Sequence, residues 1–338
     1  MACARTAPWG LHSILPPWLL AASLALAVWL PQPAGAGVTL SAGRSGLPWA
    51  SGTSNASVQL ERWRGRRLDV STVYMAMDNW RDIVRSAEWV SPKVAGARLV
   101  LAQPMLPASH RGRHAECAQG RYDSYIRALG NGLVRNGAGN AVIRLGWEAN
   151  RMGGFPWAVT GDGSSYKACF RRWVAVLRAT PGERFLIDWH MSAGGNLPYH
   201  VDRIYPGGDV VDIMGVGQYD TCPPIRSVAD WQEKIHKRNR TGGPFGLATW
   251  LAYAQSKGKA LSIPEWGIGG PRDLCRKPGF DNPLYIRMMH EFLRDHARAI
   301  AYESYFNGDG GRSPRLGTHQ LFPSRYNPRA AAAYRALW

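Results

Sequence analysis

One stretch of the chain reads AVIRLGW at residues 141–147, SYKACFRRWVAVLRA at 165–179 and RFLIDW at 184–189. The first and last of these are short apolar runs rich in residues that favour strands. The segment between them has apolar residues every three or four positions, which is typical of a helix. A strand, a helix and a second strand in this order indicate two parallel strands joined by a crossover helix.

The same alternation continues along the rest of the chain. Strands are expected at Val38 to Ala42, Leu68 to Ala76, Arg98 to Gln103, Ala141 to Trp147, Arg184 to Trp189, Val211 to Gly217, Ala260 to Pro264 and Ile300 to Phe306. Helices are expected at Tyr122 to Arg135, Ser165 to Ala179, Phe245 to Lys257 and Pro283 to His296. This α/β pattern favours a single-domain (β/α)8 TIM barrel. An open doubly wound sheet is the alternative, but Ser41 to Gly46 matches poorly the Gly-rich phosphate loop that usually follows its first strand.

The first 36 residues have the pattern of a secretory signal peptide. Arg5 precedes an apolar run from Leu19 to Leu30, and two prolines and the small-residue triplet Ala34-Gly35-Ala36 follow it. An uncleaved anchor is the alternative, although the run is shorter than the roughly 20 residues of a membrane helix. We therefore expect a signal peptide at 1–36, a catalytic domain at 37–338, no stable membrane span after cleavage, and a secreted or periplasmic protein.

The composition excludes some classes of protein and leaves the role of the charge open. Hydrophobic residues make up 45% of the 338 residues and aromatic residues 11%, which is too apolar for a disordered chain. The formal net charge is +17, with basic runs at 62–67 and 234–240. No recognised nucleic-acid motif accompanies these runs, so no nucleic-acid partner is expected. An acidic polysaccharide or an anionic envelope is a better partner than nucleic acid, but a solvated basic face without a partner is the interpretation that the charge favours.

Four cysteines follow the predicted signal peptide and show no CxxC spacing. An even number of cysteines in an exported chain favours two disulfides over a metal site, with free thiols as the alternative. Three pairings are open, and we favour the two that would tie neighbouring loops of the barrel. These pairs are Cys117 with Cys169 and Cys222 with Cys275.

Two carboxylates stand where strands of the barrel are expected to end. Glu148 follows the fourth strand and Glu265 the seventh, each beside a tryptophan, and in a barrel these ends face the active site. Cleavage of a glycosidic bond uses two such groups, one to protonate the leaving oxygen and one to attack or stabilise the anomeric carbon. A structural salt bridge at each strand end is the alternative, and it explains the pair less well than it explains either residue alone.

The surrounding motifs resemble those of glycoside hydrolase family 26. They are LGWEAN at 145–150, GGFPW at 153–157, YPGGDVVDIMGVGQYD at 205–220 and IPEWG at 263–267. The resemblance extends from about residue 68 to 307 in order and spacing. That family, best known for secreted β-mannanases, belongs to the retaining clan A of (β/α)8 glycosidases, so the resemblance implies this fold and a double displacement without a cofactor or metal.

The resemblance also implies roles for individual residues. Glu148 corresponds to the general acid/base, Glu265 to the nucleophile, Tyr219 to the tyrosine that orients the nucleophile, and Trp157 to an aromatic platform. The sequence departs from the mannanases at Trp147, where they usually carry His before the acid/base. An aromatic wall in place of a hydrogen-bonding group argues against mannan more than it argues against hydrolysis.

Further residues at the strand ends are candidates for contact with a sugar. Aromatic faces stack on sugar rings and polar groups bind hydroxyls, while loop capping or core packing is the alternative for each. The candidates are Trp80, Trp147, Trp189, Trp266, Asn150, His190, Asp220 and Asn307.

Two function classes remain at this stage. The first is an exported, monomeric retaining glycoside hydrolase that cleaves a β-linked polysaccharide: mannan, a mixed β-glucan or an exopolysaccharide. The second is a non-catalytic glycan-binding barrel of the same fold. The facing pair of carboxylates favours the enzyme, because a binding module has no need of both.

Overall fold

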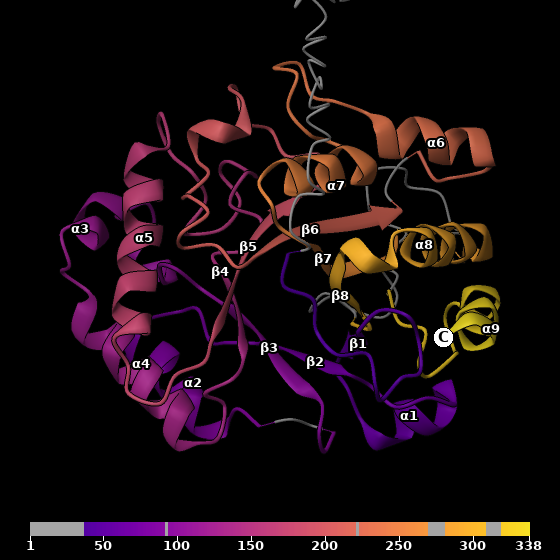
Figure 1. Ribbon diagram of the computed structural model, residues 1–338, viewed down its shortest axis with the longest axis horizontal. Helices are drawn as coiled ribbons and strands as arrows, with labels where there is room; N and C mark the ends of the chain where they lie inside the picture. The colour runs from indigo at the N-terminus through magenta and orange to yellow at the C-terminus, as the bar shows by residue number, and fades with distance from the viewer. Residues whose placement is uncertain (1–36, 92–93, 221–222, 270–280, 309–318) are drawn as a thin grey trace, which may run out of the picture. The chain divides into compact units, whose positions relative to one another are not determined.

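Parallel strands β1 to β8 close into a barrel, each hydrogen-bonded to its neighbours in chain order (Figure 1). The computed structural model describes residues 37–91, 94–220, 223–269, 281–308 and 319–338. The strands are β1 Ser51–Ser54, β2 Val70–Tyr74, β3 Arg98–Gln103, β4 Val142–Leu145, β5 Leu186–Ser192, β6 Ile213–Asp220, β7 Leu261–Ile268 and β8 Ile300–Tyr305. The (β/α)8 fold predicted from the sequence is confirmed.

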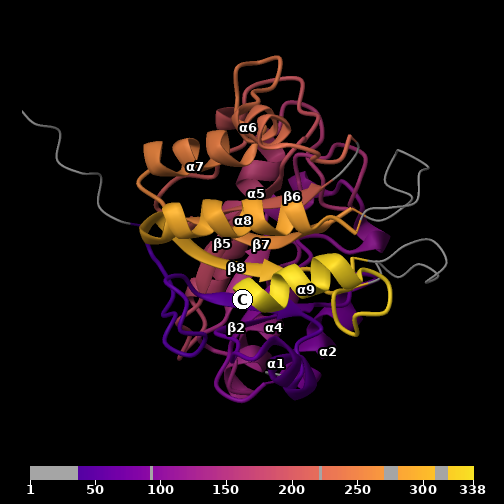
Figure 2. The same cartoon turned by 90° about the vertical axis from the view of Figure 1, so that its right-hand side faces the viewer.

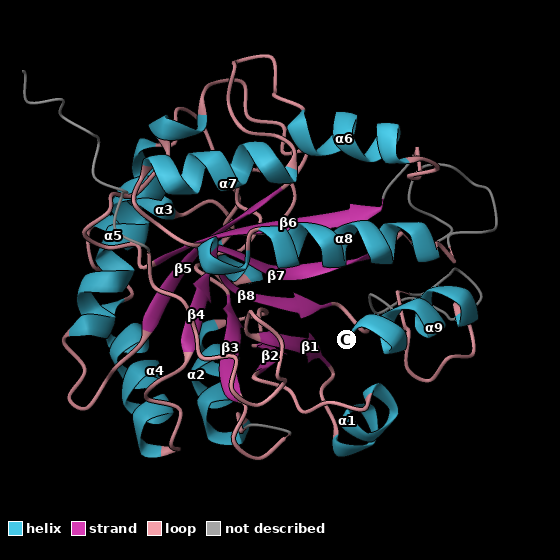
Figure 3. Cartoon of the chain, turned by 45° about the vertical axis from the view of Figure 1, so that its right-hand side comes forward, coloured by secondary structure: helices cyan, strands magenta, loops and turns pink. Residues whose placement is uncertain are grey.

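Helices surround the strands (Figure 3). They are α1 Val58–Arg64, α2 Trp80–Trp89, α3 His114–Ala118, α4 Asp123–Arg135, α5 Ser164–Arg178, α6 Val228–His236, α7 Leu247–Ser256, α8 Pro283–Asp295 and α9 Pro328–Leu337, with short 3-10 turns at Ala108–His110, Val201–Arg203 and Ala297–Ala299. The four helices expected from the sequence are found within two residues of their predicted ends. Helices α8 and α9 lie side by side (Figure 2).

The apolar spacing of α5 explains how a helix is held against the barrel. Tyr166, Phe170, Trp173 and Leu177 recur at three- and four-residue intervals and are buried. The Trp173 indole also donates a hydrogen bond of 2.9 Å to the backbone oxygen of Met105. Burial of each such side chain contributes about 2 to 3 kcal/mol, so packing rather than helix propensity fixes α5 in place.

The first strand is the one element that the sequence misplaced. Val38 to Ala42 forms no strand, although Leu40 donates a backbone hydrogen bond of 3.0 Å to Ala301. The first barrel strand is Ser51–Ser54, whose residues are small and mostly polar yet buried. A Cβ on Gly52 would lie 2.1 Å from the Val70 oxygen. Close strand packing selects small residues here, so no apolar run marks the strand.

Strands β5, β6 and β7 extend beyond the apolar runs that predicted them. Each continues by three or four residues at its C-terminal end, through His190, Tyr219 and Glu265. These polar side chains interrupt the apolar pattern because they belong to the functional end of the barrel. His190 and Glu265 are therefore fixed on strands rather than on loops.

A disulfide between Cys117 on α3 and Cys169 on α5 confirms one of the two predicted pairings. The two Cα atoms are 5.1 Å apart. Cys222 and Cys275, the other predicted pair, lie outside the described residues, as does the predicted signal peptide. Within the described ranges, no helix has the length and hydrophobicity to cross a membrane.

We expect the Cys117→Ser/Cys169→Ser double variant to lose about 4 kcal/mol of unfolding free energy, because the bond closes a loop with a sequence separation of 52 residues. Denaturant unfolding of the variant and the wild type measures the difference. A reductant should lower the wild-type midpoint toward that of the variant. Equal midpoints for the oxidised wild type and the variant would contradict a stabilising bond.

Candidate active site

Glu148 lies in a strained turn just after β4. Its φ is +53°, a left-handed conformation that costs a non-glycine residue about 1 to 3 kcal/mol. The backbone N–H of Glu148 donates a hydrogen bond of 3.0 Å to the His190 oxygen on β5. Gly146 also has a positive φ of 56°, and a Cβ there would lie 3.3 Å from the Trp157 ring. The turn therefore fixes Glu148 over the end of the barrel.

Glu265, on β7, receives hydrogen bonds from three different strands. The Tyr74 hydroxyl of β2 donates to Oε2 at 2.7 Å, and the Tyr219 hydroxyl of β6 donates to Oε1 at 2.8 Å. The guanidinium of Arg144, on β4, also donates to Oε2 and forms an ion pair with it. Both oxygens of the carboxylate are thus held in a fixed orientation.

This environment favours the ionised form of Glu265. Burial by itself would raise its pKa, but the charge of Arg144 and the donors Tyr74 and Tyr219 together bring the pKa below its usual range. Burial and the charge of Glu265 raise the pKa values of both tyrosines well above normal. Both tyrosines therefore remain protonated donors.

Glu148 has the opposite electrostatic environment. Burial, followed by the negative charge of Glu265, raises its pKa to about 6, against smaller opposing effects of Arg151 and Arg144. Arg151 lies 3.3 Å from Oε2 and is itself largely exposed. Between the lowered pKa of Glu265 and about pH 6, Glu148 is mostly protonated while Glu265 is mostly ionised.

A cleft of about 570 Å³ opens beside Glu148 at the ends of β5 and β6. Tyr219, Ser192 and Gln218 line it, together with Phe245 from the segment before α7. Glu265 accepts a hydrogen bond from Tyr219, which lines the cleft, and keeps 13% of its side chain exposed. The cleft thus gives a ligand access to the carboxyl group of Glu148, and it is large enough for part of an oligosaccharide.

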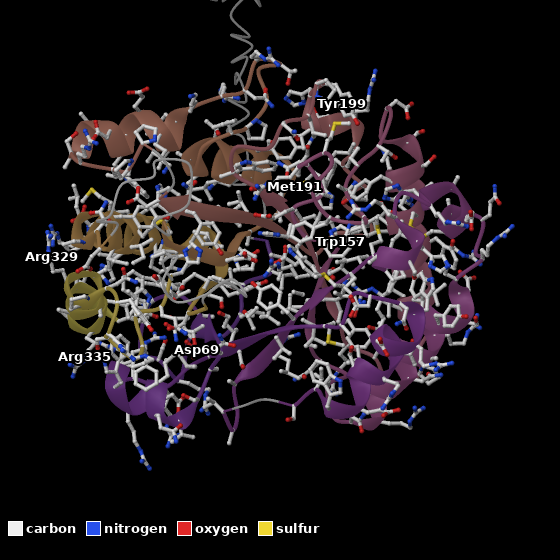
Figure 4. The ribbon with its side chains drawn as sticks, turned by 180° about the vertical axis from the view of Figure 1, so that it is seen from behind. Asp69, Trp157, Met191, Tyr199, Arg329 and Arg335 are labelled. Carbon is white, nitrogen blue, oxygen red and sulfur yellow. A yellow bond between two sulfur atoms is a disulfide. The ribbon has the colours of Figure 1, made fainter. Side chains whose placement is uncertain are left out.

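The predicted aromatic platform is buried beneath this site. Trp157 has no exposed surface and lies in the crowded interior (Figure 4). Its indole donates a hydrogen bond of 2.8 Å to the Trp147 oxygen, and Phe155 stacks on its ring at 4.9 Å between centroids. Trp157 therefore supports the turn that carries Glu148 and presents no face to a sugar. Phe155, which is partly exposed, is better placed for such a contact.

Trp147, which the sequence predicted to be an aromatic wall beside the sugar, is also buried, with 4% of its surface exposed. The Arg144 guanidinium lies over two rings that contact each other, 5.6 Å from the centroid of Trp147 and 5.4 Å from that of Tyr74. Trp147 therefore supports the cation that holds Glu265 instead of offering a free stacking surface.

Three further tryptophans point away from the barrel interior. Side chains alternate along a strand, so Trp189 points away from the barrel interior while the residues before and after it point inward. Its indole donates a hydrogen bond to the Tyr166 hydroxyl on α5. Trp266 follows Glu265 and likewise points outward, donating to Glu303 at 2.6 Å. Trp80 is buried on α2, where it stacks with Trp173 at 6.0 Å. All three are core residues, and their predicted contact with substrate does not fit this burial.

Three predicted hydroxyl-binding residues hold loops together. Asn150 bonds both backbone groups of Ser192 at 2.8 Å. Asp220 accepts from the Ile225 N–H at 2.9 Å and from Asn282 at 2.7 Å. Asn307 accepts from the N–H groups of residues 321 and 322 at 2.9 and 3.0 Å. Their side chains are committed to the backbone around the site.

His190 lies inside the barrel close to Glu148. A Cβ on Gly217 would lie 3.3 Å from His190 Nε2 and 3.4 Å from Glu148 Oε1, so a glycine here leaves space between the two groups. Neither ring nitrogen has a hydrogen-bond partner among the described residues. Burial, followed by the charge of Arg144, lowers the pKa of His190 well below normal. His190 is thus a neutral imidazole close to the carboxyl group of Glu148.

Sequence reasoning missed Arg144 and Tyr74. Arg144 is a charged residue within the apolar run of β4, and Tyr74 is a polar aromatic at the end of β2. Both positions carried a usable signal, because inward-facing polar groups at strand ends belong to the functional face of a barrel. Only the closed barrel, however, shows that both converge on Glu265.

The barrel resembles those of known glycosidases in structure. The catalytic domain of a family 26 endo-β-1,4-mannanase from Bacillus sp. JAMB-750 matches with a TM-score of 0.59 and 18% identity over 87% of this chain and 86% of that one. A family 26 β-mannanase from Bacteroides ovatus gives 0.56 and 12% over 87% and 89%, and fungal β-1,4-galactanases give 0.53 and 14% over 85% and 98%. No protein-family model and no curated protein matches the sequence.

We expect Tyr74→Phe to raise the pKa of Glu265 by about one pH unit, because the carboxylate loses one charge-assisted hydrogen bond. A 13C NMR titration of labelled glutamate carboxyls, with the signal assigned by Glu265→Gln, measures this. Tyr125→Phe, at an exposed tyrosine on α4, is the matched control. An unchanged pKa in Tyr74→Phe would show that this hydroxyl does not stabilise the ionised carboxylate.

Proposed function

We propose that this protein is an exported retaining glycoside hydrolase that cleaves a β-linked polysaccharide. The observation that carries the proposal is the pair of buried carboxyls with oppositely shifted pKa values, Glu148 raised to about 6 and Glu265 lowered. A proton donor beside an ionised nucleophile is what a double displacement at an anomeric carbon requires. The structural likeness to mannanases and galactanases supports the same class of substrate.

In the first step, ionised Glu265 attacks the anomeric carbon while the leaving oxygen takes the proton of Glu148. The C–O bond to the leaving sugar breaks and an ester forms between Glu265 and the glycosyl group. This ester is uncharged, so the negative charge that helps to raise the pKa of Glu148 disappears. The newly ionised Glu148 is therefore stabilised as a base for the second step.

In the second step, Glu148 removes a proton from water as the water oxygen attacks the anomeric carbon. The ester bond breaks, Glu265 regains its charge, and Glu148 is protonated again. Arg144 and the hydroxyls of Tyr74 and Tyr219 receive the returning carboxylate in its original orientation. After the second step Glu148 is again protonated and Glu265 is again ionised, so the site is ready for another substrate.

Export is proposed from two independent features. Residues 1–36 have the pattern of a signal peptide, and the Cys117–Cys169 disulfide suits an oxidising compartment. A polymer too large to enter a cell is a natural substrate for an enzyme outside the cytoplasm.

Incubation with mannans, β-glucans, xylans, galactans and acidic exopolysaccharides, followed by measurement of new reducing ends, tests the proposal. We expect release by the wild type, no release above background by Glu265→Gln, and a rate about 10² to 10⁴ times lower for Glu148→Gln. The control is Glu88→Gln, at an exposed glutamate on α2, which should match the wild type. A Glu265→Gln variant that releases reducing ends at the wild-type rate would refute the mechanism.

The pH dependence follows from the same two groups. kcat/KM should fall above about pH 6, where Glu148 loses the proton that it must donate, and below the lowered pKa of Glu265, where the nucleophile becomes protonated. With an aryl glycoside whose leaving group needs no proton, the loss above pH 6 should be much smaller. An alkaline limb that is the same for both leaving groups would contradict the role of Glu148 as acid.

A further inference from the structure

Basic side chains surround the cleft beside Glu148. Arg151 lies at the acid/base turn, Arg226 precedes α6, and Lys234 and Lys237 lie in α6 and at its end. Lys234 is already committed, because its Nζ donates to the Tyr219 oxygen at 3.0 Å and lies 3.8 Å from Asp220. The other three reach the cleft from two sides, β4 and α6.

Arg226 and Lys237 are exposed, and neither forms an ion pair with any residue that the structure describes. Lys237 instead lies over the ring of Phe245, with Nζ 5.4 Å from the ring centroid. Cations that have no acidic partner keep their full attraction for an anionic ligand. Lys237 is such a cation, and the charge of Arg226 is compensated only in part, by Asp230.

The acidic residues of the cleft neutralise these cations only in part, and the charge of Arg226 is one of the causes that lower the pKa of Asp230. Asp230 is held by the N-terminus of α6, where its Oδ2 accepts from the backbone N–H groups of Arg226 and Ser227 at 2.8 and 3.1 Å. Glu148 is mostly protonated below about pH 6. Glu233 is the remaining carboxylate of the cleft lining, so the cations are in excess.

Phe245 supplies an apolar surface beside these charges. Its ring is partly exposed, lines the cleft, and has its Cζ 3.4 Å from the position that a Cβ on Gly194 would take, which is ordinary van der Waals contact. An acidic sugar presents an apolar ring face and a carboxylate a few ångströms apart. Phe245 with Lys237 and Arg226 matches this pairing, and guanidinium groups bind carboxylates with two parallel hydrogen bonds.

We infer that this cleft binds a carboxylate-bearing sugar residue of the substrate, so that the enzyme prefers an acidic polysaccharide. The inference rests on the proposed glycosidase function and names its substrate class. A neutral glycan can accept hydrogen bonds from these cations through its hydroxyl oxygens, but it brings no charge to compensate them. An acidic glycan exchanges that water for charge-assisted hydrogen bonds next to the cleavage site.

The test compares chains that differ only in charge. Short β-1,4-linked manno-, gluco- and galacto-oligosaccharides are used as neutral chains and with C6 oxidised to a carboxylate. Calorimetric titration of the full-length Glu148→Gln variant, which keeps the ion pair of Arg144 and Glu265 and turns over about 10² to 10⁴ times more slowly, measures binding with little turnover. We expect the oxidised chain of at least one pair to bind about tenfold more tightly than its neutral parent, and added salt to reduce the difference.

The matched variants are Arg226→Gln/Lys237→Gln at the cleft and Arg81→Gln/Arg127→Gln on α2 and α4. Both remove two exposed cations, and α2 and α4 lie across the barrel from α6 (Figure 1). The cleft variant should lose about tenfold in affinity for the oxidised chain and none for the neutral chain. The control should change neither affinity.

Equal affinity for the two members of every pair, or an equal loss from both double variants, would overturn the inference. Wild-type cleavage of neutral chains without any preference for oxidised chains would overturn it and leave the proposed hydrolase standing. Selective binding of oxidised chains without any release of reducing ends would instead overturn the hydrolase and support the acidic-sugar site.

Discussion

The ion pair of Arg144 and Glu265 is the interaction on which the rest of the site depends. Arg144 is completely buried, and two of its guanidinium nitrogens have no hydrogen-bond partner among the described residues. A buried cation is tolerated only when an opposite charge compensates its desolvation. Glu265 supplies that charge, and Tyr74 and Trp147 flank the guanidinium. The group that stabilises the interior is thus also the proposed nucleophile, which couples the fold to the chemistry.

This ion pair separates the properties of the two carboxyls. Arg144 keeps Glu265 ionised, and the retained charge of Glu265, added to burial, raises the pKa of the nearby Glu148. The strained backbone of Glu148 and its hydrogen bond to β5 hold the protonated group beside the cleft. One buried arginine therefore helps to set both the ionised state of Glu265 and the protonated state of Glu148, with the tryptophans of the surrounding turn serving as packing.

The sequence predicted the barrel from alternating periodicity and the Glu148 and Glu265 pair from carboxylates at strand ends. An even cysteine count predicted disulfides, and the order of the barrel loops favoured the pair that is found. The contact of Tyr219 with Glu265 was predicted from the family resemblance. The sequence misplaced the first strand, because Gly52 and its small neighbours satisfy close packing without an apolar run. It also assigned Trp157, Trp189 and Trp266 to the substrate, although all three are buried. Residue type shows that a tryptophan can stack on a sugar, but only the three-dimensional fold shows which way its ring points.

Covalent trapping of the nucleophile tests the central claim most directly. A 2-deoxy-2-fluoroglycosyl fluoride that matches the preferred sugar slows the second step more than the first, so the ester should accumulate. Mass spectrometry of the digested protein should then find one added glycosyl group on the peptide that contains Glu265, and none in Glu265→Gln. A glycosyl group on another carboxyl, or hydrolysis that inverts the configuration of the anomeric carbon, would contradict the account.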